Sequence, residues 1–310
     1  MLPLIAPVSP ELLKSELTND KFIRIANKGG HHIYIVTCKD APNILREIGR
    51  LRELTFRDAG GGTGKDCDLD EFDISDMPYK QLIVWNAEEE EITGGYRFIK
   101  CGDSFDKNGH PFLATSELFE FSEEFRKDYL PYTIELGRSF VQTKYQPNPE
   151  NRTGLFSLDN LWDGLGAIMV DNPDMKYYWG KVTMYRHFNQ EARDMILYFM
   201  HYYFPDKDKL AYPIKPLLIT HDMTAFGKSL EGLDYKEGHK ILNKNVRALG
   251  ENIPPLLNSY MNVSPTMKTF GTALNDHFGD VEETGILVTI ADIYETKKER
   301  HVNTYVKRAP

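Results

Sequence analysis

The amino-acid sequence predicts an α/β (α+β) protein built on a mixed sheet with helices on its faces. Two observations support this prediction. From residue 31 to about residue 205, the predicted segments follow the order strand-helix, hairpin, strand-helix, strand-helix, which is typical of that architecture. Hydrophobic residues make up 41% of the 310 residues and aromatic residues 12%, sufficient for a large core. We expect an N-terminal arm at residues 1–30, the core at residues 31–205, and a C-terminal extension at residues 206–310 that packs on the core sheet or continues it.

The first strand–helix unit lies near the N-terminus. Residues 31–37, HHIYIVT, are rich in β-branched and aromatic side chains, as strands are. Asp40 is expected to cap the helix that follows, and Pro42 suits the first helical turn. The apolar residues of this helix recur at helical spacing: Ile44, Ile48, Leu51 and Thr55 or Phe56.

The remaining elements are predicted from the same two kinds of periodicity. An acidic turn separates two strand-like segments, residues 80–85 and 92–99, which is a hairpin pattern. The other predicted strands are residues 132–142, 177–185 and 285–291. The other predicted helices are residues 122–129, 157–170, 190–204 and 235–249, followed by a short segment at residues 256–261.

Composition excludes several classes of protein. The formal net charge of −9 argues against a general affinity for nucleic acid. The N-terminus lacks the pattern of a signal peptide, and no apolar run approaches the roughly 20 residues that span a bilayer. We therefore expect a cytoplasmic protein, with peripheral contact to the inner face of the membrane left open. Three cysteines without zinc-like spacing predict neither a disulfide framework nor a structural metal.

Familiar catalytic and binding motifs fail on inspection. Residues 59–66, AGGGTGKD, imitate a phosphate-binding loop but lack its first glycine and its magnesium-binding hydroxyl. Residues 66–77 imitate a calcium loop, yet Glu71 and Met77 replace its turn glycine and its final glutamate. The histidines have no metal-binding spacing, and no nucleophile motif is present, so we expect no metal site and no covalent enzyme intermediate.

Four charged fragments remain, in this order along the chain: Arg52 to Phe56, Asp70 to Asp73, Arg97, and Glu135 to Arg138. Each has an ordinary structural reading when taken alone. Arg52, Asp70, Asp73 and Arg97 would be solvated charges, and Glu135 with Arg138 a partly buried ion pair. Charged residues within the strand-like sequence YTIELGRSFVQ are nevertheless unusual, because strands favour β-branched and aromatic residues.

Together the fragments form R-x-x-x-F, D-x-x-D, a hairpin arginine and E-x-x-R. This order resembles the acyl-homoserine-lactone synthases and, more closely, the hemolysin-like branch of the GNAT superfamily, which contains ornithine-lipid and glycine-lipid N-acyltransferases. The resemblance extends to residues 161–169, 177–183, 253–260 and 285–292.

The resemblance implies a GNAT-like fold with a mixed, mostly antiparallel sheet, in which the fourth and fifth strands run parallel and splay to admit an acyl-pantetheine arm. It also implies transfer of a (3-hydroxy) fatty acyl group from acyl carrier protein to the amine of glycine or ornithine, giving a lyso-aminolipid. Acyl carrier protein would be the partner and thioester donor, with no permanently bound cofactor. The sequence gives no indication of oligomeric state.

The predicted strand at residues 132–142 fits this chemistry physically. Strict alternation would place Glu135 and Arg138 on opposite faces of the sheet. A β-bulge at Gly137 would bring them to one cleft and would free backbone N–H groups of Gly137, Ser139 and Phe140 for the thioester carbonyl and its oxyanion. Glu135 is the candidate base for the attacking amine, and Arg138 would keep it ionised and anchored.

The other predicted site residues would serve the two substrates. Arg52, Phe56, Asp70, Asp73 and Arg97 would shape the acceptor site, where an arginine suits a carboxylate. The loop after the catalytic strand departs from the usual coenzyme-A motif, and only Arg152 and Gly154 suggest a contact to the pantetheine phosphate. This departure favours acyl carrier protein over coenzyme A. The candidate basic contacts to that acidic carrier are Lys144, Arg152, Lys176, Lys181 and the C-terminal basic residues.

Three other functions stay open at this stage. A homoserine-lactone synthase would use S-adenosylmethionine as acceptor. A secreted, membrane-lytic hemolysin is disfavoured, because the chain shows no signal peptide and no long amphipathic segment. A non-enzymatic module that only binds acyl carrier protein would keep the fold without turnover.

Overall fold

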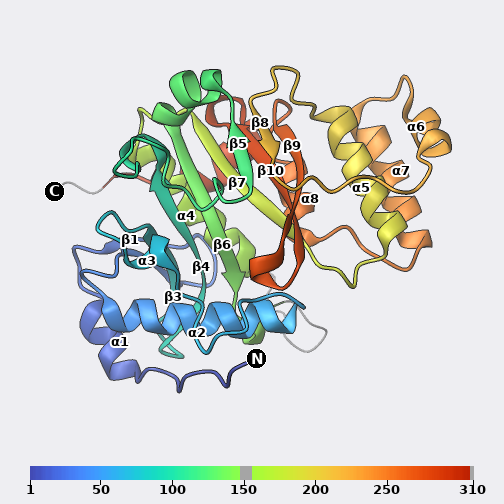
Figure 1. Cartoon of the computed structure of the whole chain (residues 1–310). Coiled ribbons are helices and arrows are strands. Elements are labelled where there is room, and N and C mark those ends of the chain that lie inside the picture. The colour runs from blue at the N-terminus through green and yellow to red at the C-terminus, as the bar shows by residue number, and fades with distance from the viewer. Residues whose placement is uncertain (147–155, 308–310) are drawn as a thin grey trace.

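The computed structural model describes residues 1–146 and 156–307. Its centre is an eight-stranded sheet in the order β1-β2-β3-β4-β6-β7-β10-β9 (Figure 1). All neighbouring strands are antiparallel except β6 and β7, which are parallel. The bounds of these strands are β1 Phe22–Ile25, β2 His32–Val36, β3 Lys80–Asn86, β4 Glu91–Lys100, β6 Thr133–Val141, β7 Tyr177–Met184, β9 Lys268–Asn275 and β10 Val281–Thr289.

Helices cover both faces of this sheet, because the central strands have apolar side chains on both faces. On one face, Ile83 and Trp85 of β3 pack with α2 (Pro42–Asp58). On the other face, Leu82 and Val84 lie in the hydrophobic cluster that includes α4 (Ser157–Asp171), and α5 (Gln190–Tyr203) contributes to the same cluster. The shorter elements are α1 Pro10–Glu16, α3 Glu71–Ile74, β5 Phe119–Phe121, β8 Ala211–Pro213, α6 Thr224–Leu230, α7 Tyr235–Ala248, α8 Pro255–Met261 and α9 Glu295–His301.

Every strand and every long helix predicted from periodicity is present, with ends that shift by a few residues. The prediction missed β1, which pairs with β2 from within the segment expected to be an arm. It also missed β9, which with β10 continues the sheet beyond β7. None of the helices in the described part of the chain is long and apolar enough to cross a bilayer.

The predicted cap of α2 was wrong. Asp40 folds back on the preceding turn, where its carboxylate accepts hydrogen bonds from the backbone N–H (3.0 Å) and hydroxyl (2.9 Å) of Thr37. The first turn of α2 is instead capped by Glu16, whose carboxylate accepts from the backbone N–H groups of Asn43 (3.1 Å) and Ile44 (2.9 Å). The N-terminal segment therefore satisfies donors that α2 cannot satisfy itself.

Strand β6 contains a bulge in its middle. Opposite it on β4, Arg97 pairs with Gly137 and Gly95 pairs with Phe140, so two residues of β6, Arg138 and Ser139, share one position of β4. The predicted bulge is therefore confirmed, but it begins one residue after Gly137. Arg138 adopts the left-handed region (φ 48°), which non-glycine residues rarely occupy.

The parallel strands β6 and β7 separate at this bulge, as the GNAT-like expectation requires. Their pairing runs from Thr133 and Tyr177 to Leu136 and Gly180 and ends there. A Cβ atom at Gly180 would lie 2.7 Å from the carbonyl oxygen of Leu136, so only glycine permits this last close approach. The splay therefore opens directly beside the bulge.

Candidate active site

Arginine and aspartate side chains from three segments meet on the α2 face of the sheet. Arg97 donates to both carboxylate oxygens of Asp70 (2.6 and 2.7 Å) and to Asp73 (3.2 Å). Arg52, fully buried on α2, donates to Asp73 (3.0 Å) and to Gln81 (2.6 Å), which in turn donates to Asp73 (2.9 Å). Gln81 and Arg97 are cross-strand partners on β3 and β4, so the hairpin aligns them.

Electrostatics hold this cluster in its charged form. Burial alone would raise the pKa of Asp73, but the charges of Arg52 and Arg97 outweigh it and keep that pKa well below its usual value. Burial likewise opposes the charge of Arg97, yet Asp73 and Asp70 raise its pKa above the usual range. Asp73 and Arg97 therefore stabilise each other in their charged forms.

Arg138 joins the same network because of the bulge. Its Nε lies 3.0 Å from Asp68 Oδ2, its Nη2 lies 3.6 Å from Asp70 Oδ2, and its guanidinium stacks 4.1 Å above the ring of Phe278. Asp68 is fully buried. Sequence reasoning missed Asp68, although it lies two residues before Asp70 in the same acidic stretch.

Glu135 is anchored by hydroxyl groups. Its carboxylate is 1% exposed and accepts hydrogen bonds from Tyr79 (2.8 Å) and Thr115 (2.5 Å). The Thr115 hydroxyl accepts in turn from the Trp179 indole (2.7 Å). Burial raises the pKa of Glu135, against the opposing effects of the two hydroxyls and of Arg97. The expectation that Arg138 anchors Glu135 was wrong, since Arg138 has its ion pairs with Asp68 and Asp70.

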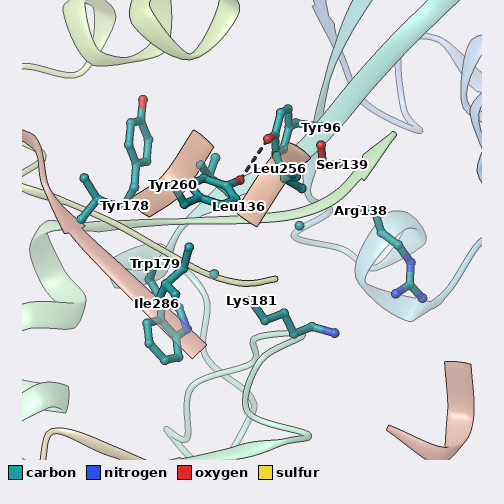
Figure 2. A pocket seen from close by; sticks show the side chains of 13 residues that line it. Tyr96, Leu136, Arg138, Ser139, Tyr178, Trp179, Lys181, Leu256, Tyr260 and Ile286 are labelled. Atoms are coloured by element: carbon teal, nitrogen blue, oxygen red, sulfur yellow. Dashed lines mark hydrogen bonds between the residues drawn. The ribbon is translucent and has the colours of Figure 1, made fainter. Parts of the chain in front are cut away.

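A pocket lies in the splay between β6 and β7 (Figure 2). Gly137 and Gly180 line it at the point where the two strands part. In Figure 2, Arg138 and Lys181 lie on one side of this pocket, and Tyr178 and Tyr260 lie on the other. The apolar lining comes from four elements: Leu136 of β6, Tyr178 of β7, Leu256 of α8, and Ile286 and Val288 of β10.

Two tyrosine hydroxyls meet at the apolar side. The hydroxyls of Tyr96 on β4 and Tyr260 on α8 are 3.0 Å apart, and burial raises the pKa of both. The hydroxyl of Ser139, a bulge residue, interacts with Tyr96 as well. Tyr178 is fixed separately by donating to the Leu165 carbonyl (2.8 Å).

The remaining predicted residues occupy supporting positions. Phe56 is 7% exposed and packs edge-on against Phe278 (5.0 Å), the ring beneath Arg138. Of the three predicted backbone donors, Gly137 and Ser139 line the pocket; Gly137 and Phe140 are paired in the sheet with Arg97 and Gly95, and Ser139 lies in the bulge between them. The residues expected to contact the pantetheine phosphate, Arg152 and Gly154, lie outside the described residues.

Lys181 is not on the surface expected for a carrier contact. Its side chain is 11% exposed, lines the pocket and forms an ion pair with Glu283 of β10. Sequence reasoning did not identify its partner, or Tyr79, Gln81 and Thr115. These residues lie between the motifs and carry no spacing signal of their own.

Comparisons with known proteins agree with this geometry. Residues 51–152 match the model of the acetyltransferase (GNAT) domain family. The chain is 56% identical to a glycine N(alpha)-acyltransferase of Phocaeicola vulgatus over 316 residues, covering 100% of this chain and 95% of that protein. It is 55% identical to a glycine N(alpha)-acyltransferase of Bacteroides thetaiotaomicron over 315 residues, covering 100% and 92%.

Two solved structures are also similar. FeeM, an N-acyl amino acid synthase from uncultured soil microbes, has a TM-score of 0.40 and 9% identity, covering 88% of this chain and 94% of FeeM. The AHL synthase LasI has a TM-score of 0.34 and 14% identity, covering 50% and 74%. The resemblance to GNAT-fold N-acyltransferases is confirmed by the full-length relatives and the family model, and the chain belongs to the glycine N(alpha)-acyltransferase family.

Proposed function

We propose that this acyltransferase moves a (3-hydroxy) fatty acyl group from the pantetheine thioester of acyl carrier protein to the amine of glycine. The product would be an N-acylglycine, a lyso-aminolipid. The observation that carries this proposal is the pocket in the splay, which has apolar side chains on one side and the cations Arg138 and Lys181 on the other. A fatty acyl chain suits the first environment and a zwitterionic amino acid suits the second. The similarity to glycine N(alpha)-acyltransferases supports glycine, rather than ornithine, as the acceptor.

The bulge of β6 gives the thioester its position. Residues at a bulge leave the regular ladder, so their backbone N–H groups are available to a ligand. Gly137 and Ser139 line the pocket at this point. Of these two, Ser139 lies in the bulge, and its N–H group would bind the thioester carbonyl and stabilise the oxyanion that develops when the amine attacks.

Glu135 would remove the proton that blocks attack. An ammonium ion has no lone pair, so the acceptor must lose a proton before its nitrogen bonds to the carbonyl carbon. The raised pKa of Glu135 makes it a stronger base than an exposed glutamate. Because the carboxylate is nearly fully buried, the proton would reach it through water or through the hydroxyls of Thr115 and Tyr79. The new C–N bond then forms as the C–S bond breaks, and a proton released from the amine neutralises the thiolate.

One assay tests the whole proposal. The purified protein is incubated with acyl carrier protein loaded with a 3-hydroxy fatty acid, together with glycine, ornithine or S-adenosylmethionine, and the product masses are recorded. We expect N-acylglycine. Absence of any N-acyl product from every acceptor would refute the proposal, and carrier binding without turnover would leave only a binding module. A parallel reaction with acyl-coenzyme A identifies the donor.

A further inference from the structure

The charged side chains that line the pocket are all positive in the described part of the chain. Arg138 and Lys181 are its two charged lining residues in the described part of the chain, and no aspartate or glutamate lines it there. Their acidic partners Asp68, Asp70 and Glu283 are not among the lining residues, and Asp68 and Glu283 are only 0% and 3% exposed. A ligand in the pocket therefore meets two cations at close range, and an anionic group is the chemical match.

The ion pair with Glu283 positions Lys181 and uses only part of the hydrogen-bonding capacity of its ammonium group. Its partner Glu283 is itself fixed, because Glu283 also accepts from Asn275 (2.8 Å) and Thr183 (3.1 Å). An ammonium group has three N–H donors. Glu283 is its one hydrogen-bond and ion-pair partner within the described residues, so two donors remain for a ligand.

Arg138 also retains free donors, whereas the other arginines of the cluster do not face the pocket. The contacts of Arg138 to Asp68 and Asp70 involve Nε and, at 3.6 Å, Nη2. Arg52 and Arg97 have side chains that are 0% and 3% exposed, and both donate to buried acids. A carboxylate that enters the pocket would thus reach Lys181 and Arg138 before any other cation.

We propose that Lys181 and Arg138 together bind the carboxylate of the acceptor amino acid, with Lys181 as a determinant of acceptor specificity. This inference rests on the proposed function. In an α-amino acid a single carbon separates carboxylate and amine, so a carboxylate held at Lys181 places the amine beside the splay where the thioester is proposed to lie. Gly137 and Gly180, which line the pocket, carry no side chains that would block this approach.

The test removes either the carboxylate of the acceptor or the ammonium group of Lys181. Acyl transfer to glycine is compared with transfer to glycinamide, which keeps the amine and lacks the carboxylate, in wild type and in Lys181→Met. A hydrogen-bonded charge pair of this kind typically accounts for about 10- to 100-fold in kcat/KM. We expect wild type to prefer glycine by about that factor, and Lys181→Met to lose the preference through a higher KM for glycine while glycinamide is unaffected.

Controls separate this role from loss of folding and from other anions. Lys181→Met leaves the buried Glu283 unpaired, so the double variant Lys181→Met/Glu283→Gln tests the same loss with the local charge balanced. Lys181→Arg should recover part of the preference, and Lys240→Met, an exposed lysine of α7, should behave as wild type. Equal losses with both acceptors, or no loss, would overturn the proposal, since they would indicate a role toward the thioester, the pantetheine phosphate or the fold. Failure of the proposed function itself would be distinct: wild type would make no N-acylglycine.

Discussion

The two sides of the splay pocket differ in how they are built. On the charged side, Arg138 and Lys181 line the pocket. Arg138 belongs to a network of ion pairs among segments between residues 52 and 138, and Lys181 of β7 pairs with Glu283. The apolar side depends on α8 and β10, in the last part of the chain. The charged side requires particular residue types at fixed positions, whereas the apolar side requires volume and shape. Changes on the first side should therefore affect turnover or, where they break a buried ion pair, stability. Changes on the second should affect stability and the choice of acyl chain.

The largest effect is expected at Glu135. Glu135→Gln keeps the size of the side chain and one accepting oxygen but removes the proposed base, so kcat should fall by about 10²- to 10⁴-fold. The rate of N-acylglycine formation measures it, and Glu120→Gln, an exposed glutamate of β5, is the matched control. In wild type, kcat should rise with pH through a pKa above the ordinary glutamate value of 4.5, because the base acts when deprotonated. Unchanged turnover in the variant would remove Glu135 from the mechanism.

The next effect concerns the stability of the charged side. Asp73→Asn deprives Arg52 and Arg97 of a shared buried carboxylate, and breaking a buried ion pair costs about 3–5 kcal/mol. The folded-state pKa of Asp73 lies below its ordinary value of 3.8, so its stabilising contribution is complete above that pH and is lost as the pH falls below it. Urea unfolding at about pH 7 and about pH 3 should show a smaller acid loss for the variant than for wild type. An identical acid dependence would contradict this account.

The apolar side is tested at Tyr260. Tyr260→Phe leaves the buried Tyr96 hydroxyl without its 3.0 Å partner and should lower the free energy of unfolding by about 1–3 kcal/mol. Turnover of glycine should change little, while the relative rates with donors of different chain length or with and without a 3-hydroxyl should change. Tyr212→Phe, an exposed tyrosine of β8, provides the control. A large loss of kcat with every donor would place Tyr260 in the chemistry instead.

The smallest effect should come from the cap of α2, far from either side of the pocket. Glu16→Ala removes the acceptor for two backbone N–H groups and should cost about 1 kcal/mol of unfolding free energy. Thermal unfolding measures this difference. Glu11→Ala, also on α1, should leave the midpoint of unfolding nearly unchanged. An equal shift for both variants would contradict the capping role of Glu16.

The charged side was largely predictable from the sequence, and the apolar side was not. Strands β3, β4 and β6 follow local periodicity, and a short turn aligns Gln81 with Arg97, so their motifs meet for local reasons. The decisive contacts of Lys181 and Tyr96 are with residues 102 and 164 positions away, which no spacing rule in a single sequence reveals. The cap of α2 was mispredicted for the same reason, since its true acceptor lies on α1.

The bulge shows a second limit of local reasoning. Gly137 was the natural candidate because glycine adopts left-handed backbone conformations at little cost. The structure assigns that conformation to Arg138, whose ion pair with Asp68 and stacking on Phe278 offset the conformational strain. Tertiary contacts therefore overrode the intrinsic preference of the backbone by one residue.

The position of α8 and β10 in the chain has a consequence for biosynthesis. A ribosome that adds about 5–20 residues per second needs roughly 5–20 s to travel from Lys181 to Val288, the last pocket residue on β10. During that interval Glu135 and the arginine cluster have already been synthesised, while β7 lacks its partner strand β10 and the splay pocket lacks the lining that α8 and β10 supply. The proposed site of the nascent chain is therefore complete only after β10 has been translated.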